Sequence, residues 1–161
     1  MAAKILVSAC LLGQPVRYNG TALPLESEIL ETWRRAGRIV PFCPEVAAGF
    51  AVPRSPAEIE PGCDGEDVRL GTARILEDTG GDVTRQFRDG AERTLAHALS
   101  HGCRYALLTD GSPSCGSSFI YSGAYDGVRR AGQGVVTATL RASGIQVFGQ
   151  HQIAALDRLI A

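Results

Sequence analysis

The alternation of four short apolar segments with longer segments of helical periodicity constrains the fold of this chain more than any other feature of its sequence. The apolar segments occupy residues 4–9, 38–42, 105–109 and 145–148. Short segments that are apolar nearly throughout are typical of parallel strands, because both faces of such strands are covered. The helical segments occupy residues 23–37, 82–100, 132–142 and 150–161. This order predicts an α/β fold, a three-layer sandwich of the Rossmann or flavodoxin-like kind, in which a mostly parallel sheet carries helices on both faces.

Individual residues sharpen the prediction of each element. In residues 82–100 apolar side chains recur every four residues, which predicts one buried helix face with Asp82 as the N-terminal cap. These side chains are Val83, Phe87, Ala91, Leu95 and Leu99. Pro24 suits the first turn of the helix over 23–37, and Gly37 suits its end. Pro41 predicts that the second strand lies at an edge of the sheet or ends there, because proline lacks the N–H that a central strand donates.

Residues 47–81 are rich in glycine and proline and show no sustained period. We expect a long surface excursion there, with a hairpin near residues 68–75. The chain has 161 residues and a mass of 17.0 kDa, which suits a single domain over residues 1–161 with one core.

The composition limits the partners of this protein. Sixteen basic and seventeen acidic residues give a formal net charge of −1, so the chain has no general attraction for macromolecular nucleic acid. No apolar run is long enough to cross a membrane. Residues 7–10 resemble a lipoprotein cleavage site, but the residues before Cys10 are too few for a complete signal peptide. We therefore expect a cytoplasmic monomer or dimer that binds a small molecule and has no membrane partner.

Three of the five cysteines follow predicted strands. Cys10, Cys43 and Cys115 come directly after, or a few residues after, three strands expected to be parallel. The carboxyl ends of parallel strands share one edge of a sheet, where such folds bind ligands, so we expect the three thiols to meet there. Cys63 falls in the excursion and Cys103 precedes a strand at the opposite edge, and we expect both to be structural.

Three thiolates without a fourth suggest a metal centre with one open position, because structural zinc sites are normally closed by four ligands. Thiolate ligands suit zinc, copper(I) and iron–sulfur clusters alike, and the spacing alone does not choose between them. His97 and His101 form an H-x-x-x-H pair on a predicted helix, but no third ligand lies near them in the sequence.

Three motifs in this order resemble those of the 2-thiouracil desulfidase family, formerly a domain-of-unknown-function family. They are SACLLG at residues 8–13, CPE at residues 43–45 and SPSCG at residues 112–116. Pro53 and Arg54 also match, and the likeness extends over about residues 4–148. The resemblance implies an enzyme that removes sulfur from thiolated pyrimidines, giving the oxo-base and sulfide. It also implies an oxygen-sensitive [4Fe–4S] cluster, held by three cysteines with one iron open.

The resemblance assigns roles residue by residue. It makes Cys10, Cys43 and Cys115 the cluster ligands, with Glu45 and Ser112 as catalytic residues. We expect Glu45 to transfer a proton. We expect Ser114 and Arg17 to contact the substrate, Arg17 through a pyrimidine carbonyl or a nucleotide phosphate. Asn19, residues 109–111 and residues 149–150 depart from the family pattern and leave the choice of thiolated base or nucleotide open.

Two alternatives remain at this point. The three cysteines alone also suit a metal- or cluster-binding sensor module without turnover. A cysteine after the first strand followed by an arginine resembles low-molecular-weight phosphatases, but six residues separate Cys10 from Arg17, where the phosphatase loop needs five.

Overall fold

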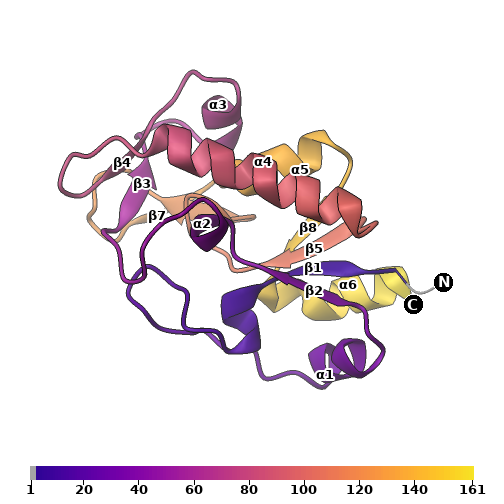
Figure 1. The fold of residues 1–161 in the computed structure, drawn as a ribbon. Helices are drawn as coiled ribbons and strands as arrows, with labels where there is room; N and C mark the ends of the chain where they lie inside the picture. Colours follow the sequence, from indigo (N-terminus) through magenta and orange to yellow (C-terminus); the bar gives the residue numbers. More distant parts are fainter. Residues whose placement is uncertain (1–2) are drawn as a thin grey trace.

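The computed structural model describes residues 3–161 and contains a four-stranded parallel sheet at its centre (Figure 1). The strands are β1 (Ile5–Ser8), β2 (Ile39–Phe42), β5 (Tyr105–Leu108) and β8 (Gln146–Gly149). Their order is β2-β1-β5-β8, and each neighbouring pair is parallel. Pro41 therefore lies in an edge strand, as predicted, where its missing N–H interrupts no central ladder. The predicted α/β sandwich is confirmed.

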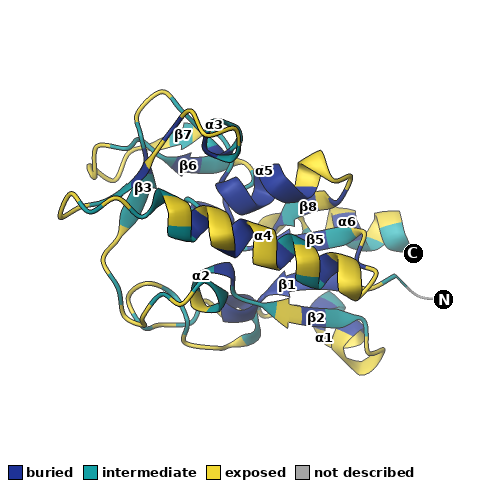
Figure 2. Cartoon of the chain, turned by 45° about the horizontal axis from the view of Figure 1, so that its top comes forward, coloured by how far each residue is buried: buried dark blue, intermediate teal, exposed yellow. Residues whose placement is uncertain are grey.

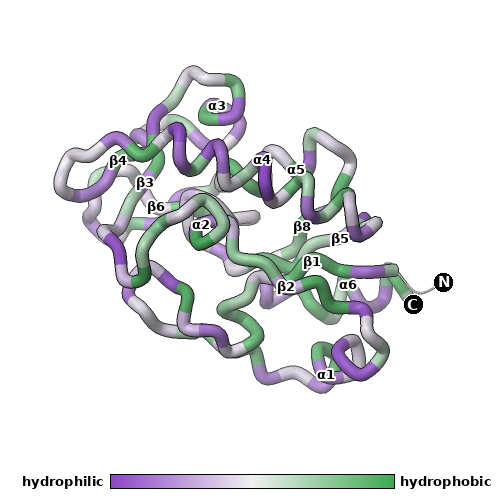
Figure 3. The backbone as a smooth tube through the Cα atoms, viewed as in Figure 1, coloured by the Kyte–Doolittle hydropathy of each residue, from purple (hydrophilic) through white to green (hydrophobic). Residues whose placement is uncertain are grey.

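Helices cover both faces of the sheet and create two cores. One face carries α4 (Thr84–Ser100) and α5 (Val135–Ala142), and the other carries α1 (Glu28–Arg35) and α6 (Ile153–Ile160). Successive strand side chains point to opposite faces, so Leu6 packs toward α4 and α5 while Ile5 and Val7 pack toward α1 and α6. Figure 2 shows the central strands and the inner helix faces as buried, and Figure 3 shows β1 and β2 as hydrophobic.

The first helix begins later than the sequence predicts. It starts at Glu28, where the Ser27 hydroxyl accepts the Leu30 N–H at 3.4 Å. Residues 23–26 instead run extended along a short 3₁₀ helix, η1 (Ala9–Leu12), to which Leu23 and Leu25 donate backbone hydrogen bonds. The prediction for Pro24 is therefore wrong, because these backbone bonds hold its segment in a non-helical conformation.

The long helix matches its predicted range, but its buried face differs at the C-terminal end. Leu99 is 57% exposed, whereas Thr94 and Ala98 are buried. Residues four apart on an α-helix are offset by about 40° around the helix axis, because 3.6 residues complete one turn. After a few such steps the side chain no longer points to the buried face. Asp82 lies before the helix and accepts hydrogen bonds from the backbone N–H and the hydroxyl of Thr84.

The excursion over residues 47–81 is more structured than predicted. Its strands β3 (Ala57–Ile59) and β4 (Ile75–Glu77) pair antiparallel, with helix α3 (Gly65–Arg69) between them. The hairpin expected near residues 68–75 is thus misplaced, since Val68 lies in α3. Ile59, Val68 and Ile75 are buried in the core, so this segment is not only a surface loop.

Several further elements complete the chain. A second hairpin, which the sequence analysis does not predict, joins β6 (Phe119–Tyr121) to β7 (Arg129–Ala131). Helix α2 (Pro44–Ala47) follows β2, and η2 (Gln150–Gln152) precedes α6. Among residues 3–161 no helix has the length and apolarity that crossing a membrane requires.

Candidate active site

The three cysteines that follow strands line one cavity of about 500 Å³. Cys10 lies in η1 directly after β1, Cys43 caps α2 directly after β2, and Cys115 lies in the loop after β5. The three strands are adjacent and parallel, with β1 between β2 and β5, which brings their carboxyl ends to the same edge of the sheet. The expected convergence is therefore present. Cys63 and Cys103 lie outside the cavity wall.

Burial sets the protonation of these thiols. Burial raises the pKa of Cys115, and the negative charges of Glu45 and Cys43 add to that effect. Burial also raises the pKa of Cys43 and of Cys10. The Thr109 hydroxyl, 2.8 Å from the Cys10 sulfur, and the positive charge of Arg17 act in the opposite direction on Cys10. Three thiols so placed become thiolates when a cation binds them, because metal ligation requires the deprotonated form.

Glu45 projects into the same cavity from the first turn of α2 and is held at both carboxylate oxygens. Arg54 donates from Nε to Oε1 at 3.0 Å, and Ser114 donates from its hydroxyl to Oε2 at 2.9 Å. The Arg54 side chain is only 7% exposed and also donates to the carbonyls of Val16 and Ala51. A buried ion pair with these additional hydrogen bonds fixes the carboxylate in one orientation.

The loop after β5 presents Ser112 and Cys115 to the cavity. The Ser112 hydroxyl accepts the Cys115 N–H at 2.7 Å and lies 3.2 Å from the Ser114 hydroxyl. Ser114 gives its hydroxyl hydrogen to Glu45, so Ser112 is the donor between the two serines. This arrangement leaves one lone pair of the Ser112 oxygen open to the cavity.

Asp110 holds this loop in shape from its buried position at the start of the loop. Its carboxylate accepts the backbone N–H groups of Gly111, Ser117 and Ser118 at 2.8–3.1 Å, and the Ser118 hydroxyl as well. Burial acts to raise the pKa of Asp110, but these hydrogen bonds outweigh it and hold the pKa below its usual range. The carboxylate is therefore ionised at neutral pH and keeps the cysteine loop closed.

The predicted site residues occupy two kinds of position. Arg17, Glu45 and Ser112 line the cavity together with the three cysteines. We expected Ser114 to contact the substrate, but it does not line the cavity. It is fully buried and donates a hydrogen bond to Glu45. Its hydroxyl therefore orients the carboxylate.

Sequence reasoning did not identify Arg54, Thr109 and Asp110 as site residues. The resemblance includes Pro53 and Arg54 without a role for the arginine, and its pairing with Glu45 depends on a turn that no motif encodes. His97 lies on α4 and stacks on Phe42, and His101 caps the C-terminus of that helix. The two imidazole ring centroids are 4.3 Å apart, and neither residue lines the cavity.

The donor set, three cysteine thiols on one cavity, fits an iron–sulfur cluster. Throughout residues 3–161, no three side chains of cysteine, histidine, aspartate or glutamate come close enough to share one metal ion. An iron–sulfur cluster is larger than one ion and binds its cysteines at different irons, so its ligands stand farther apart. Thiolates are the ligands that such clusters use. Three thiols on the wall of one cavity therefore suit an iron–sulfur cluster with one iron free of protein ligands.

The cavity has two parts, a floor and a mouth. The floor consists of Cys10, Cys43, Cys115, Glu45 and Ser112, at the strand ends. The mouth consists of the solvent-facing wall residues Tyr18, Pro56, Glu58, Asp78 and Tyr125.

The parallel sheet and its floor of three thiols beside a fixed carboxylate define an α/β enzyme of the cysteine-ligated cluster class. Known proteins agree with this assignment. A sequence profile described as 2-thiouracil desulfurase matches residues 5–152. The chain belongs to the 2-thiouracil desulfurase family.

Two relatives support the family assignment. The protein YbbK of Bacillus subtilis (strain 168), described as uncharacterized, is 42% identical over 149 residues, which span 92% of this chain and 97% of YbbK. The solved structure of the [4Fe-4S]-dependent thiouracil desulfidase TudS is similar with a TM-score of 0.88 and 47% identity, covering 98% of this chain and 97% of that one. The phosphatase alternative has no support in these relationships.

Proposed function

We propose that this protein removes the sulfur atom of a thiolated pyrimidine such as thiouracil, giving the oxo-base and sulfide. The observation that carries the proposal is the convergence of Cys10, Cys43 and Cys115 on one cavity beside Glu45. Family membership and the similarity to a [4Fe-4S]-dependent thiouracil desulfidase support the same reaction. The reaction balances without an oxidant or reductant: the thiocarbonyl and water become the carbonyl and hydrogen sulfide.

Cys10, Cys43 and Cys115 would hold the [4Fe–4S] cluster. When bound, the cluster supplies an iron without a protein ligand, a Lewis acid for sulfur. The protein contributes a largely enclosed floor, with Cys10 and Cys115 buried, in which charges act more strongly than in bulk water. Thr109 contributes a hydroxyl beside the Cys10 sulfur, and hydrogen bonds to ligand sulfurs tune such clusters.

Glu45 is the proton-transfer residue of this proposal. Its two oxygens each accept one hydrogen bond, from Arg54 and from Ser114, and a carboxylate has lone pairs left for a third partner. Glu45 takes a proton from the water that attacks the carbon bearing the sulfur, and returns it to the departing sulfide. Transfer by a positioned group contributes typically about 10²–10⁴-fold to the rate.

Ser112 positions the pyrimidine ring. Because its hydrogen points to Ser114, its oxygen offers an acceptor to the cavity. A ring N–H of the substrate is a matching donor. Arg17, on the same cavity wall, supplies donors for a ring carbonyl. The partner is thus a small molecule. We place the reaction in the cytoplasm, where cysteines stay reduced.

The proposal is tested by reconstituting the purified protein with iron and sulfide without oxygen and offering it 2-thiouracil. We expect uracil and sulfide in equal amounts, and no turnover before reconstitution. Glu45→Gln should keep the iron and lose turnover. A reconstituted protein that binds the cluster but converts no thiolated pyrimidine would instead support the sensor alternative.

A further inference from the structure

A hydroxyl group lies against one of the three floor sulfurs. The Thr109 hydroxyl oxygen is 2.8 Å from Sγ of Cys10, although the two residues are 99 positions apart in the chain. Thr109 follows β5 directly and Cys10 lies just after β1, and these two strands are parallel neighbours. The backbone N–H of Thr109 also donates to the Ser8 hydroxyl at 2.9 Å. The strand pairing and this hydrogen bond fix the Thr109 hydroxyl beside the sulfur.

The contact has a definite donor once Cys10 is ionised. A thiol and a hydroxyl can each donate, but a thiolate has no hydrogen and can only accept. Within residues 3–161 the Thr109 hydroxyl forms no other hydrogen bond, so its hydrogen is available for the sulfur. Metal ligation requires the thiolate. The ligated form of Cys10 thus leaves Thr109 as the donor of a charge-assisted hydrogen bond.

The serine hydroxyls near Cys115 have different partners. Ser112 donates to Ser114, and Ser114 donates to Glu45 at 2.9 Å. Ser114 precedes Cys115 in the chain, but its single hydrogen is used for the carboxylate. Neither serine therefore does for Cys115 what Thr109 does for Cys10, and the two ligands differ in this respect.

We propose that Thr109 is a positioning residue that acts on the cluster through Cys10: its hydrogen bond draws electron density from the ligand sulfur and makes the cluster easier to reduce. Hydrogen bonds to cysteine sulfurs are among the features that set the potential of such clusters. A sulfur that gives less electron density to iron also leaves the open iron a stronger Lewis acid for a thiocarbonyl. The inference rests on the proposed function, which supplies the cluster.

The test is a potentiometric titration of the reconstituted enzyme, kept without oxygen. Dithionite supplies the electron, and electron paramagnetic resonance follows the one-electron reduction of the cluster. Thr109→Val keeps the shape of the side chain and removes the hydroxyl, so the midpoint potential should shift to a more negative value while the iron content stays unchanged. Thr109→Ala should shift it in the same direction. Thr109→Ser keeps a hydroxyl and should retain the wild-type potential.

Turnover of 2-thiouracil is the second measurement. Loss of an outer hydrogen-bond partner of a metal ligand typically costs about 10–100-fold in affinity or activity. We expect kcat of Thr109→Val to fall about tenfold, at the lower end of that range, because all three cysteines and Glu45 remain. Thr109→Ser should restore most of the wild-type kcat.

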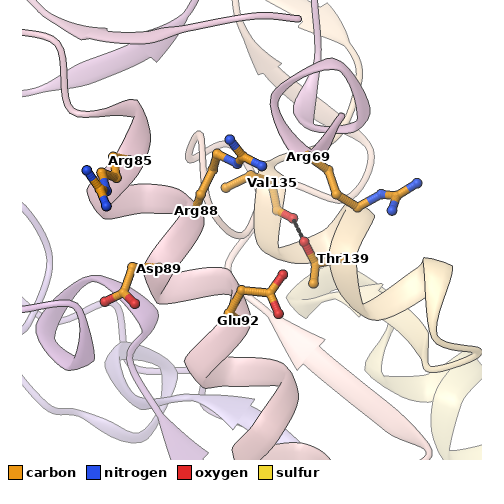
Figure 4. A pocket seen from close by; sticks show the side chains of 7 residues that line it. All are labelled: Arg69, Arg85, Arg88, Asp89, Glu92, Val135 and Thr139. Carbon is orange, nitrogen blue, oxygen red and sulfur yellow. Dashed lines mark hydrogen bonds between the residues drawn. The ribbon is translucent and has the colours of Figure 1, made fainter. Parts of the chain in front are cut away.

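Thr139→Val is the matched control, since it removes a buried threonine hydroxyl away from the floor. Thr139 lies on α5, and its hydroxyl donates to the Val135 carbonyl at 2.8 Å (Figure 4). Both residues border a separate surface depression between α4 and α5, with Arg88 and Glu92. This variant should keep the wild-type potential, iron content and kcat.

An unchanged potential or an unchanged kcat in Thr109→Val would overturn the inference and leave the proposed reaction intact. Loss of iron in Thr109→Val, or a potential of Thr109→Ser equal to that of Thr109→Val, would overturn it as well. If the wild type converts no 2-thiouracil but the potential shifts as expected, the proposed reaction fails and the action of Thr109 on the cluster stands.

Discussion

The floor and the mouth of the cavity are built in different ways. The floor residues lie in the segments that follow three strands of the central sheet, where the hydrogen-bonded ladder and two buried cores fix the strand ends. The mouth residues come from inserted segments: the loop after η1, the β3–β4 pair and the β6–β7 loop. This contrast between floor and mouth indicates that residues at the rigid sheet edge carry out the reaction and that residues of the inserted segments select the substrate. Changes in the floor should therefore affect turnover, and changes in the mouth should affect selectivity.

The largest effect should follow the loss of a floor thiol. Cys115→Ala, Cys43→Ala or Cys10→Ala should abolish the cluster and all turnover, because two cysteines do not hold it. Iron content after anaerobic reconstitution measures this outcome. Cys103→Ala is the control: it changes a buried thiol at the opposite edge and should keep the iron. Loss of iron in that variant alone would contradict the ligand assignment.

The next largest effect concerns proton transfer. Glu45→Gln keeps the shape of the side chain and removes its basicity, so kcat should fall about 10²–10⁴-fold. Iron content and the absorption of the cluster should stay as in the wild type. Steady-state assays at several thiouracil concentrations separate kcat from KM, and an unchanged kcat would remove Glu45 from the mechanism.

Arg54 should have a smaller effect because it acts through Glu45. Arg54→Lys retains a positive charge but loses the donors to the carbonyls of Val16 and Ala51. We expect kcat to fall about tenfold, with a change in the pH–rate profile that a purely structural role would not produce. Arg54→Ala should lower kcat more than Arg54→Lys does. Equal kcat values in the two variants would argue that the charge of Arg54 does not position Glu45.

The smallest effect should come from the mouth. Tyr125 lies in the β6–β7 loop, and its hydroxyl donates to the carbonyl of Leu76 on β4. Tyr125→Phe removes this link, which is worth about 1 kcal/mol, so KM should rise a few-fold while kcat and iron content stay constant. A drop in kcat as large as that of the Glu45 variant would contradict the assignment of turnover to the floor and of substrate binding to the mouth.

The same division explains what the sequence predicts well. The strands before Cys10, Cys43 and Cys115 are short and apolar because both faces are covered, so their pattern is clear. Parallel pairing then brings residues far apart in the chain to one edge without any further information. The family motifs add Glu45 and Ser112 to this edge.

The remaining parts depend on contacts that no local pattern contains. Strand β7 is Arg129–Ala131, largely exposed and without alternating hydrophobic residues, so its pairing with β6 is visible only in the structure. The sequence pattern predicts Val68 in a strand, but Val68 lies in helix α3 with its side chain buried. The pairing of Arg54 with Glu45 and the burial of Ser114 behind Glu45 are likewise tertiary facts.

The most direct test of the central claim is an anomalous-scattering map, recorded at the iron edge from crystals of protein reconstituted and kept without oxygen. The account predicts one compact iron cluster between the sulfurs of Cys10, Cys43 and Cys115, with one iron free of protein ligands and turned toward Glu45. Iron bound at another place, or a cluster whose irons all carry protein ligands, would contradict it.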